Sequence, residues 1–170
     1  MSAASDRREL RLARRTGSHR CSDHLVVAPL WVAYNVNLGT LLRTCDAVGA
    51  CMAVPASPHY LEALARGDTL VRRPCIHWLD CERERWVEAQ RALGWRIVAV
   101  ELAERSVSLP RLEVAREPTI VLLGHESSGI PEEMVDAADT CVEIPMLGVG
   151  RSLNVAVAGS LVLYRLAGLA

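Results

Sequence analysis

The 170-residue sequence contains no lysine and no phenylalanine, and several patterns that would point directly to a function are also missing. Neither Gly-x-Gly-x-x-Gly nor Gly-x-x-x-x-Gly-Lys-Ser/Thr occurs, so the two commonest nucleotide-binding loops are excluded. The apolar run 153–163 is shorter than the roughly 20 residues that a membrane span needs. The N-terminus is charged and lacks the apolar core of a signal peptide. We therefore expect a soluble cytoplasmic protein with no membrane partner.

The overall composition of the chain suits one packed domain. Hydrophobic residues make up 51% and charged residues 23% of the chain, which favours a folded core over disorder. The formal net charge is −1, but residues 1–20 hold six arginines against Asp6 and Glu9, a net of +4. We expect a basic N-terminal arm over residues 1–23, flexible or helical, and one domain over residues 24–170. All basic residues are arginine, a bias from which we infer no mechanism.

The six cysteines show neither a disulfide framework nor a metal-binding spacing. Because no secretory signal precedes them, we expect reduced thiols, several of them packing as small apolar groups. No Cys-x-x-Cys pair is present. Cys75-x-His77-x-x-x-Cys81 combines zinc-ligand types, but its spacing is poor. The sequence therefore predicts no metal.

Short apolar runs alternate with helical patterns, which indicates an α/β fold with a mainly parallel sheet flanked by helices. The expected strands are Leu25–Ala33, Ala50–Val54, Ile76–Leu79, Trp95–Val100, Thr119–Leu123 and Thr140–Ile144. The expected helices are Leu38–Val48, Pro58–Arg66, Glu82–Leu93, Pro131–Ala138 and Ser152–Leu166. Segment 101–118 is polar and contains two prolines, so we expect a surface loop there.

Two of these helices differ in how they must pack. The helix 38–48 carries one apolar stripe, and Arg43 projects far from it. On pattern alone, Arg43 is a solvated helix arginine. The last helix is apolar on nearly every side, so the sheet or a partner chain must enclose it.

Three segments combine glycine, polar side chains and a helix start directly after a strand: residues 35–43, 123–131 and 144–158. Ligands bind at the carboxyl ends of strands in open α/β sheets, so a site belongs at these positions. Each segment also has a purely structural explanation. Asn37 and Ser152 suit helix caps, and Gly124 and Gly129 suit a tight turn.

In this order, the three segments resemble the SpoU (TrmH-like) family of SPOUT methyltransferases over about residues 24–168. That family shows Asn-x-x-x-x-x-Arg, here Asn37 to Arg43, and Leu-Gly-x-Glu-x-x-Gly, here Leu123 to Gly129. It ends in Ile-Pro-Met…Ser-Leu-Asn-Val-Ala-x-Ala, here Ile144 to Ala158. The resemblance implies methylation of a ribose 2′-hydroxyl in RNA with S-adenosylmethionine as methyl donor and no metal. It also implies a homodimer and a C-terminal deep trefoil knot, which breaks the rule that chains do not thread loops.

Carried over position by position, the resemblance implies two sets of site residues. The catalytic set is Asn37, Arg43, Glu126, Ser152 and Asn154. The cofactor set is Leu123, Gly124, Gly129, Ile144, Pro145, Met146, Gly148, Ser152 and Leu153. Arg43 has two open roles, because a guanidinium holds its proton above pH 12. It is either a strongly perturbed base or a fixed cation that stabilises the developing alkoxide.

The run from Arg43 to Gly49 is more similar to members of the family that act on transfer RNA, so tRNA is favoured over rRNA as the substrate. The alternative function is a non-catalytic RNA-binding or assembly protein on the same fold. Asn37, Arg43, Glu126 and Asn154 speak against it, because a structural role does not require these side chains. A dinucleotide-binding oxidoreductase is disfavoured because the phosphate-binding fingerprint is missing.

Overall fold

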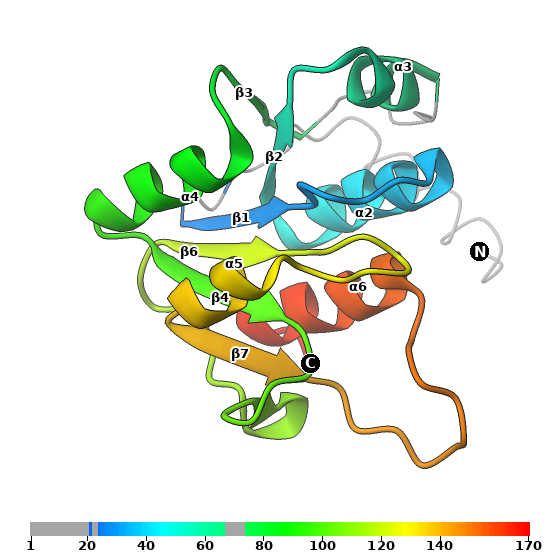
Figure 1. Ribbon diagram of the computed structural model, residues 1–170, viewed down its shortest axis with the longest axis vertical. Helices are drawn as coiled ribbons and strands as arrows, with labels where there is room; N and C mark the ends of the chain where they lie inside the picture. The colour runs from blue at the N-terminus through cyan, green and yellow to red at the C-terminus, as the bar shows by residue number, and fades with distance from the viewer. Residues whose placement is uncertain (1–20, 22–23, 67–73) are drawn as a thin grey trace, which may run out of the picture.

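The computed structural model describes residues 21, 24–66 and 74–170, and nearly all of the predicted arm lies outside them. Within these residues one sheet has the strand order β3-β2-β1-β6-β4-β7-β5, and every strand pair is parallel (Figure 1). The strands are β1 (Leu25–Ala28), β2 (Cys51–Pro55), β3 (Ile76–Leu79), β4 (Arg96–Val100), β5 (Val107–Ser108), β6 (Thr119–Leu122) and β7 (Thr140–Glu143). The expected α/β fold with a mainly parallel sheet is confirmed.

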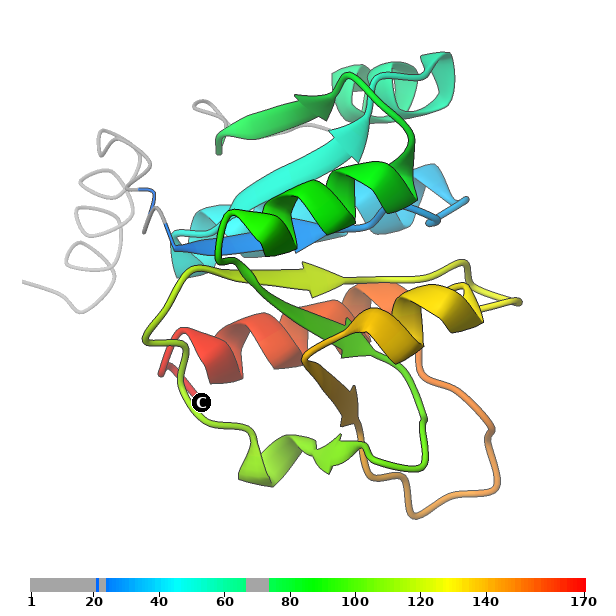
Figure 2. The ribbon, with the colours of Figure 1, turned by 60° about the vertical axis from the view of Figure 1, so that its left-hand side comes forward.

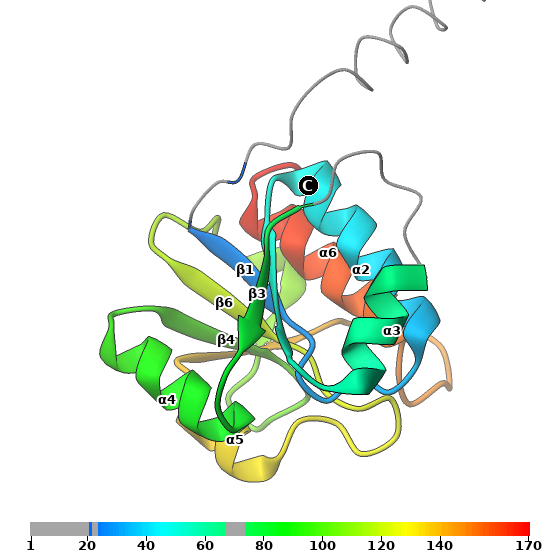
Figure 3. The same cartoon turned by 90° about the horizontal axis from the view of Figure 1, so that it is seen from above.

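Helices cover both faces of this sheet, which gives three layers (Figures 2 and 3). One face carries α2 (Asn35–Val48), α3 (Pro58–Arg66) and α6 (Val155–Leu166), and the other carries α4 (Arg83–Ala92) and α5 (Glu132–Ala137). Alternate strand residues supply the two cores, so Val27 and Val121 pack toward α2 and α6 while Ile97 and Ile120 pack toward α4 and α5. Both faces are buried, which explains the continuous apolar runs in the sequence.

The first strand is shorter than the sequence suggests. The apolar run predicts a strand over 25–33, but β1 ends at Ala28 because Pro29 follows and has no N–H for the ladder. The Tyr60 hydroxyl reaches the carbonyl oxygens of Pro29 and Leu30, at 2.9 and 2.7 Å. Residues 29–34 are therefore released from the sheet, and they form the turn into α2.

Other expectations also need adjustment. Helix α6 begins at Val155 rather than Ser152, because the cap residue is Asn154. Segment 101–118, expected as a loop, contains β5 and a 3₁₀ turn, η1 (Leu109–Arg111).

The six cysteines all lie among the described residues and form no disulfide. Nowhere in the described ranges is a helix both long and apolar enough to traverse a bilayer.

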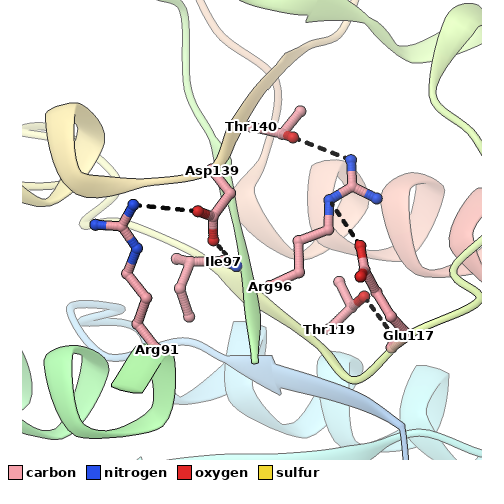
Figure 4. Close-up of polar contacts among 7 residues, drawn as sticks. All are labelled: Arg91, Arg96, Ile97, Glu117, Thr119, Asp139 and Thr140. Atoms are coloured by element: carbon pink, nitrogen blue, oxygen red, sulfur yellow. Dashed lines mark hydrogen bonds and ion pairs between the residues drawn. The ribbon is translucent and has the colours of Figure 1, made fainter. Parts of the chain in front are cut away.

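A group of polar contacts holds the starts of β4 and β7 together at the amino edge of the sheet (Figure 4). The Asp139 carboxylate accepts the Ile97 N–H at 2.8 Å and pairs with Arg91 of α4 at 3.3 Å. Beside it, Arg96 donates to the Thr140 hydroxyl at 3.0 Å. Charged side chains thus lie where the strands begin, and the loops that follow the strands project from the opposite edge (Figure 2).

Candidate functional site

An open pocket of about 1800 Å³ lies at the carboxyl ends of β4, β6 and β7. Its walls come from the segments that leave these strands, residues 101–105, 123–130 and 144–146, and from residues 151–155 before α6. Small-molecule sites usually occupy about 300–1000 Å³. The pocket therefore has room for a cofactor and for part of a larger substrate beside it.

Glu126 joins the 123–130 segment to the start of α2. Its carboxylate accepts hydrogen bonds from the N–H groups of Ala33 and Tyr34, at 2.9 and 3.1 Å, and from Asn37 Nδ2 at 2.7 Å. Burial favours the neutral acid, but these three donors outweigh it and lower the pKa of Glu126. The residue before α2, Tyr34, has no side-chain cap of its own. The Tyr34 N–H instead donates to a carboxylate 92 residues further along the chain, which lies at the end of the helix that favours a negative charge.

Asn154 extends this network to the last helix. Its Nδ2 donates to Asn37 Oδ1 at 3.1 Å, and its Oδ1 accepts the N–H groups of Ala156 and Val157, at 2.9 and 3.2 Å. Asn154, and not Ser152, is thus the cap of α6. Asn37 lies within the first turn of α2 and uses its side chain to bridge Glu126 and Asn154, so it is not the cap of α2.

The loop between β6 and α5 is closed by contacts within the chain. His125 and Gly129 exchange backbone hydrogen bonds of 2.9 Å in each direction. A side chain on Gly124 would meet the Gly129 and Ile130 backbone, and Gly129 has a φ of 71°. The two glycines are therefore required by the tight turn that the sequence suggests.

Apolar side chains line the part of the pocket nearest the sheet. Leu123 is buried, Ile144 is half-buried, and Met146 and Leu153 are exposed toward the opening. The carboxylate of Glu101 stands at the end of β4 in the same pocket. S-adenosylmethionine has an adenine ring, ribose hydroxyls and a positive sulfonium. An apolar slot with backbone polar groups and nearby carboxylates suits all three parts.

Most of the expected site residues line this one pocket. From the catalytic set they are Asn37, Glu126, Ser152 and Asn154, and from the cofactor set they are Leu123, Gly124, Gly129, Ile144, Pro145, Met146, Ser152 and Leu153. Arg43 and Gly148 are not among the lining residues. Arg43 is exposed on α2, as its position off the apolar stripe predicts.

Sequence reasoning missed Glu101. Its carboxylate accepts the Ile130 N–H and the Leu102 N–H, both at 3.2 Å, so it braces the loop that carries Glu126. Glu101 directly follows the predicted strand 95–100, at the edge where a site is expected. That position alone could have identified it.

His125 was also missed, although it lies inside the second motif. Its Nδ1 accepts the Ser127 N–H at 3.1 Å and lies 3.0 Å from the Ser127 hydroxyl. The spacing of the motif does not show whether position 125 has a functional role, so it could not identify His125.

Comparison with known proteins places these residues in a wider group. Residues 24–164 match the model of the SpoU rRNA Methylase family. The chain is 35% identical over 132 residues to a tRNA (cytidine(34)-2′-O)-methyltransferase from Beijerinckia indica, which covers 75% of this chain and 80% of the relative. It is 30% identical over 136 residues to a tRNA (guanosine(18)-2′-O)-methyltransferase from Aquifex aeolicus, covering 75% and 61%.

Among solved structures, an rRNA methyltransferase from Sinorhizobium meliloti with bound AdoMet is similar, with a TM-score of 0.71 and 30% identity. The match covers 90% of this chain and 59% of that one. The chain spans between 9% and 61% of the length of several curated relatives that it matches.

Proposed function

Since the chain belongs to the SpoU rRNA Methylase family, we propose that it transfers a methyl group from S-adenosylmethionine to a ribose 2′-hydroxyl in RNA. The observation that carries this proposal is the hydrogen-bonded series Glu126–Asn37–Asn154. It brings the three separate motifs of the sequence into one pocket, across 89 and 117 residues of chain.

The cofactor would lie in the apolar part of the pocket, against Leu123, Ile144, Met146 and Leu153. When bound, S-adenosylmethionine would supply an electrophilic methyl group to the ribose oxygen, with S-adenosylhomocysteine as the leaving group and the hydroxyl proton released to solvent. The protein's own contribution is positioning, because an in-line displacement depends on alignment of the reacting atoms. Glu126, Asn37 and Asn154 hold the two helix starts that frame the pocket.

A homodimer belongs to the same proposal. The residues Leu153, Val157, Leu161 and Tyr164 follow helical spacing and are 40%, 45%, 42% and 37% exposed, which leaves an apolar stripe on α6 and the segment before it. The buried side of α6 packs into the core, and a second copy of the chain would cover the exposed stripe. Because Arg43 does not line the pocket of its own chain, the partner's pocket would receive it.

The C-terminal trefoil knot is proposed from the family and from the position of α6. The segment 144–154 leaves the carboxyl edge beside β7, and α6 then packs next to α2 (Figures 1 and 3). Gly159 of α6 lies against Leu123 and Leu41, so a side chain there would collide with both. A knotted chain pulled from both ends should stop short of its full extended length of about 3.3–3.6 Å per residue.

The proposal has three further parts. The protein is cytoplasmic, its preferred RNA is transfer RNA, and the boundary between the N-terminal arm and the methyltransferase domain lies between residues 23 and 24. The A. aeolicus and B. indica relatives are named as tRNA methyltransferases, which supports transfer RNA over ribosomal RNA. The family match begins at residue 24, which supports the proposed boundary of the domain.

The test is incubation of the full chain with methyl-labelled S-adenosylmethionine and separated tRNA and rRNA fractions, followed by nuclease mapping of the labelled nucleotide. The matched control is Met146→Arg, which fills the proposed cofactor slot at an exposed position. We expect label in the tRNA fraction as a 2′-O-methylated nucleotide, and none with the control. RNA binding without label in either fraction would contradict the proposal and favour the non-catalytic alternative.

A further inference from the structure

Three cysteine thiols meet at the edge of the sheet opposite to the pocket. The sulfur atoms of Cys21, Cys51 and Cys75 all lie within 4.8 Å of one another, and those of Cys21 and Cys75 are 2.9 Å apart. Cys21 precedes β1, Cys51 opens β2 and Cys75 immediately precedes β3. Neither the methyl-transfer proposal nor the polar network of the pocket involves them.

Backbone pairing explains why Cys51 and Cys75 meet. β1, β2 and β3 are parallel neighbours, so their starts lie at one edge of the sheet. The register pairs Val26 with Cys51 and Met52 with Ile76, and the Met52 N–H donates to the Cys75 carbonyl at 2.9 Å. The sheet itself therefore places Cys51 beside Cys75, and Cys21 joins them from the segment before β1.

We propose that Cys21, Cys51 and Cys75 form a zinc-binding site with a fourth position for water or another ligand. Zinc–sulfur bonds of about 2.3 Å in tetrahedral geometry place thiolate sulfurs about 3.8 Å apart. The Cys21–Cys75 separation of 2.9 Å is shorter than that value and no separation exceeds 4.8 Å, so small side-chain rotations bring the three sulfurs onto one ion. A group made only of thiols selects zinc and other soft or borderline ions over magnesium or calcium.

The three cysteines also provide a route for the ion. Cys51 is buried, Cys21 is half-buried and Cys75 is exposed, so the site opens to solvent at one side. Such an entry path is one of the features that a real metal site needs. The zinc would join the segment before β1 to the starts of β2 and of the edge strand β3.

This trio differs from the zinc-ligand types noted in the sequence. Cys75, His77 and Cys81 cannot share one ion, because β3 runs away from Cys75 at about 3.3 Å per residue. Cys81 follows β3 and so lies toward the other edge of the sheet. Among the described residues, the group that places three potential ligands within reach of one ion is Cys21, Cys51 and Cys75.

The experiment uses the full chain, reduced and stripped of metal with a chelator that is then removed. Zinc is titrated against a chromophoric competitor, and Co²⁺ is added in parallel because thiolate ligation gives it a charge-transfer absorption. Cys21→Ser and Cys75→Ser remove ligands at the two less buried positions. The matched control is Cys81→Ser, which removes a half-buried thiol outside the trio.

We expect one zinc per chain, a thiolate band with Co²⁺ and a higher thermal unfolding midpoint when zinc is bound. Both ligand variants should lose stoichiometric zinc, the band and the shift, and Cys81→Ser should retain all three. Absence of stoichiometric zinc from the reduced chain would overturn the proposal. Zinc binding that survives both ligand variants would overturn it too, as would a Cys21–Cys75 disulfide that persists under reductant. Methyl transfer is not a readout, so the outcome is independent of the proposed function.

Discussion

The side-chain amide of Asn154 donates a hydrogen bond of 3.1 Å to the amide oxygen of Asn37, 117 residues earlier in the chain. The same Asn154 caps α6, and the same Asn37 donates to Glu126. One contact between two amides therefore connects the starts of α2 and α6 with the loop after β6. This link makes the stability of the fold and the geometry of the pocket depend on the same side chains.

Asn154→Ala should lower the free energy of unfolding by about 1 kcal/mol, because the first N–H groups of α6 lose their acceptor. Asn154→Ser keeps a capping oxygen but lacks the amide that reaches Asn37. We expect the serine variant to retain most of the stability and to lose methyl transfer. Urea unfolding and single-turnover assays separate the two effects. An alanine variant as stable as wild type would contradict the capping role.

Glu126 should make stability depend on acidic pH. Its pKa is lowered in the folded protein, so the stabilisation is present above the ordinary carboxyl pKa of about 4.3 and is lost as pH falls through the lowered value. Between about pH 5 and 2, wild type should therefore lose more unfolding free energy than Glu126→Gln. Urea unfolding over this range provides the measurement. Glu104→Gln, at an exposed position on the same pocket, should follow wild type.

Arg43→Ala should leave stability within about 0.5 kcal/mol of wild type, because the side chain is exposed on α2. Cofactor affinity, measured by calorimetry, should be unchanged. Single-turnover methylation should fall on the order of 100-fold or more, because the proposed role of Arg43 is to place its charge at the reacting oxygen. Arg43→Lys should also be poor, since a flexible ammonium does not reproduce the planar guanidinium. Near-normal turnover by Arg43→Ala would refute its catalytic role.

Mixed dimers test whether Arg43 acts in the partner's pocket. One protomer carries Arg43→Ala and the other carries Met146→Arg. If Arg43 crosses the interface, one site of the mixed dimer is complete, and activity should return although both parent variants are inactive. If each protomer uses its own Arg43, no complete site forms and the mixture stays inactive.

Leu161→Arg should convert the proposed homodimer to a monomer, because it places a charge in the exposed apolar stripe of α6. Light scattering at micromolar concentration measures the change. Leu169→Arg is the matched control, since Leu169 is 59% exposed but lies beyond α6. A Leu161→Arg protein that remains dimeric would place the interface elsewhere.

Residues 1–20 lie outside the described residues, and their removal deletes a net charge of +4. RNA affinity should fall and its salt dependence should become shallower, because fewer arginines release counterions from phosphates. Filter binding over a range of salt concentrations, with cofactor affinity as the control, measures both. An unchanged affinity and slope would show that the arm has no part in RNA capture.

Much of the fold could be predicted because both faces of the sheet are buried. Four-residue apolar runs such as 119–122 stand out from the helices that separate them, and α3 is correct at both ends. The errors lie where a local rule competes with the pattern. Pro29 ends β1 early, and Asn154 rather than Ser152 caps α6.

The site was predicted differently from the fold. Periodicity places the three motif segments after strands. It cannot show that Asn37 forms hydrogen bonds with both Glu126 and Asn154. Only the resemblance to a family grouped them. The resemblance gave no indication of Glu101, whose hydrogen bond from Ile130 in the loop after β6 depends on the strand order. Strand order also brings Cys51 beside Cys75, where Cys21 joins them, and the spacing of the three in sequence does not reveal this.

The placement of α6 also determines when the protein can first work during its own synthesis. Chains emerge from the ribosome N-terminus first, and early segments fold as they appear. β1, β2 and β3 can pair at that stage, but β6 begins 40 residues after the end of β3 and the cap at Asn154 lies 75 residues after it. A nascent chain that ends before Asn154 lacks part of the pocket wall and the hydrogen bond from Asn154 to Asn37. Truncated translation products of this protein are therefore expected to be inactive, whatever part of the sheet they have formed.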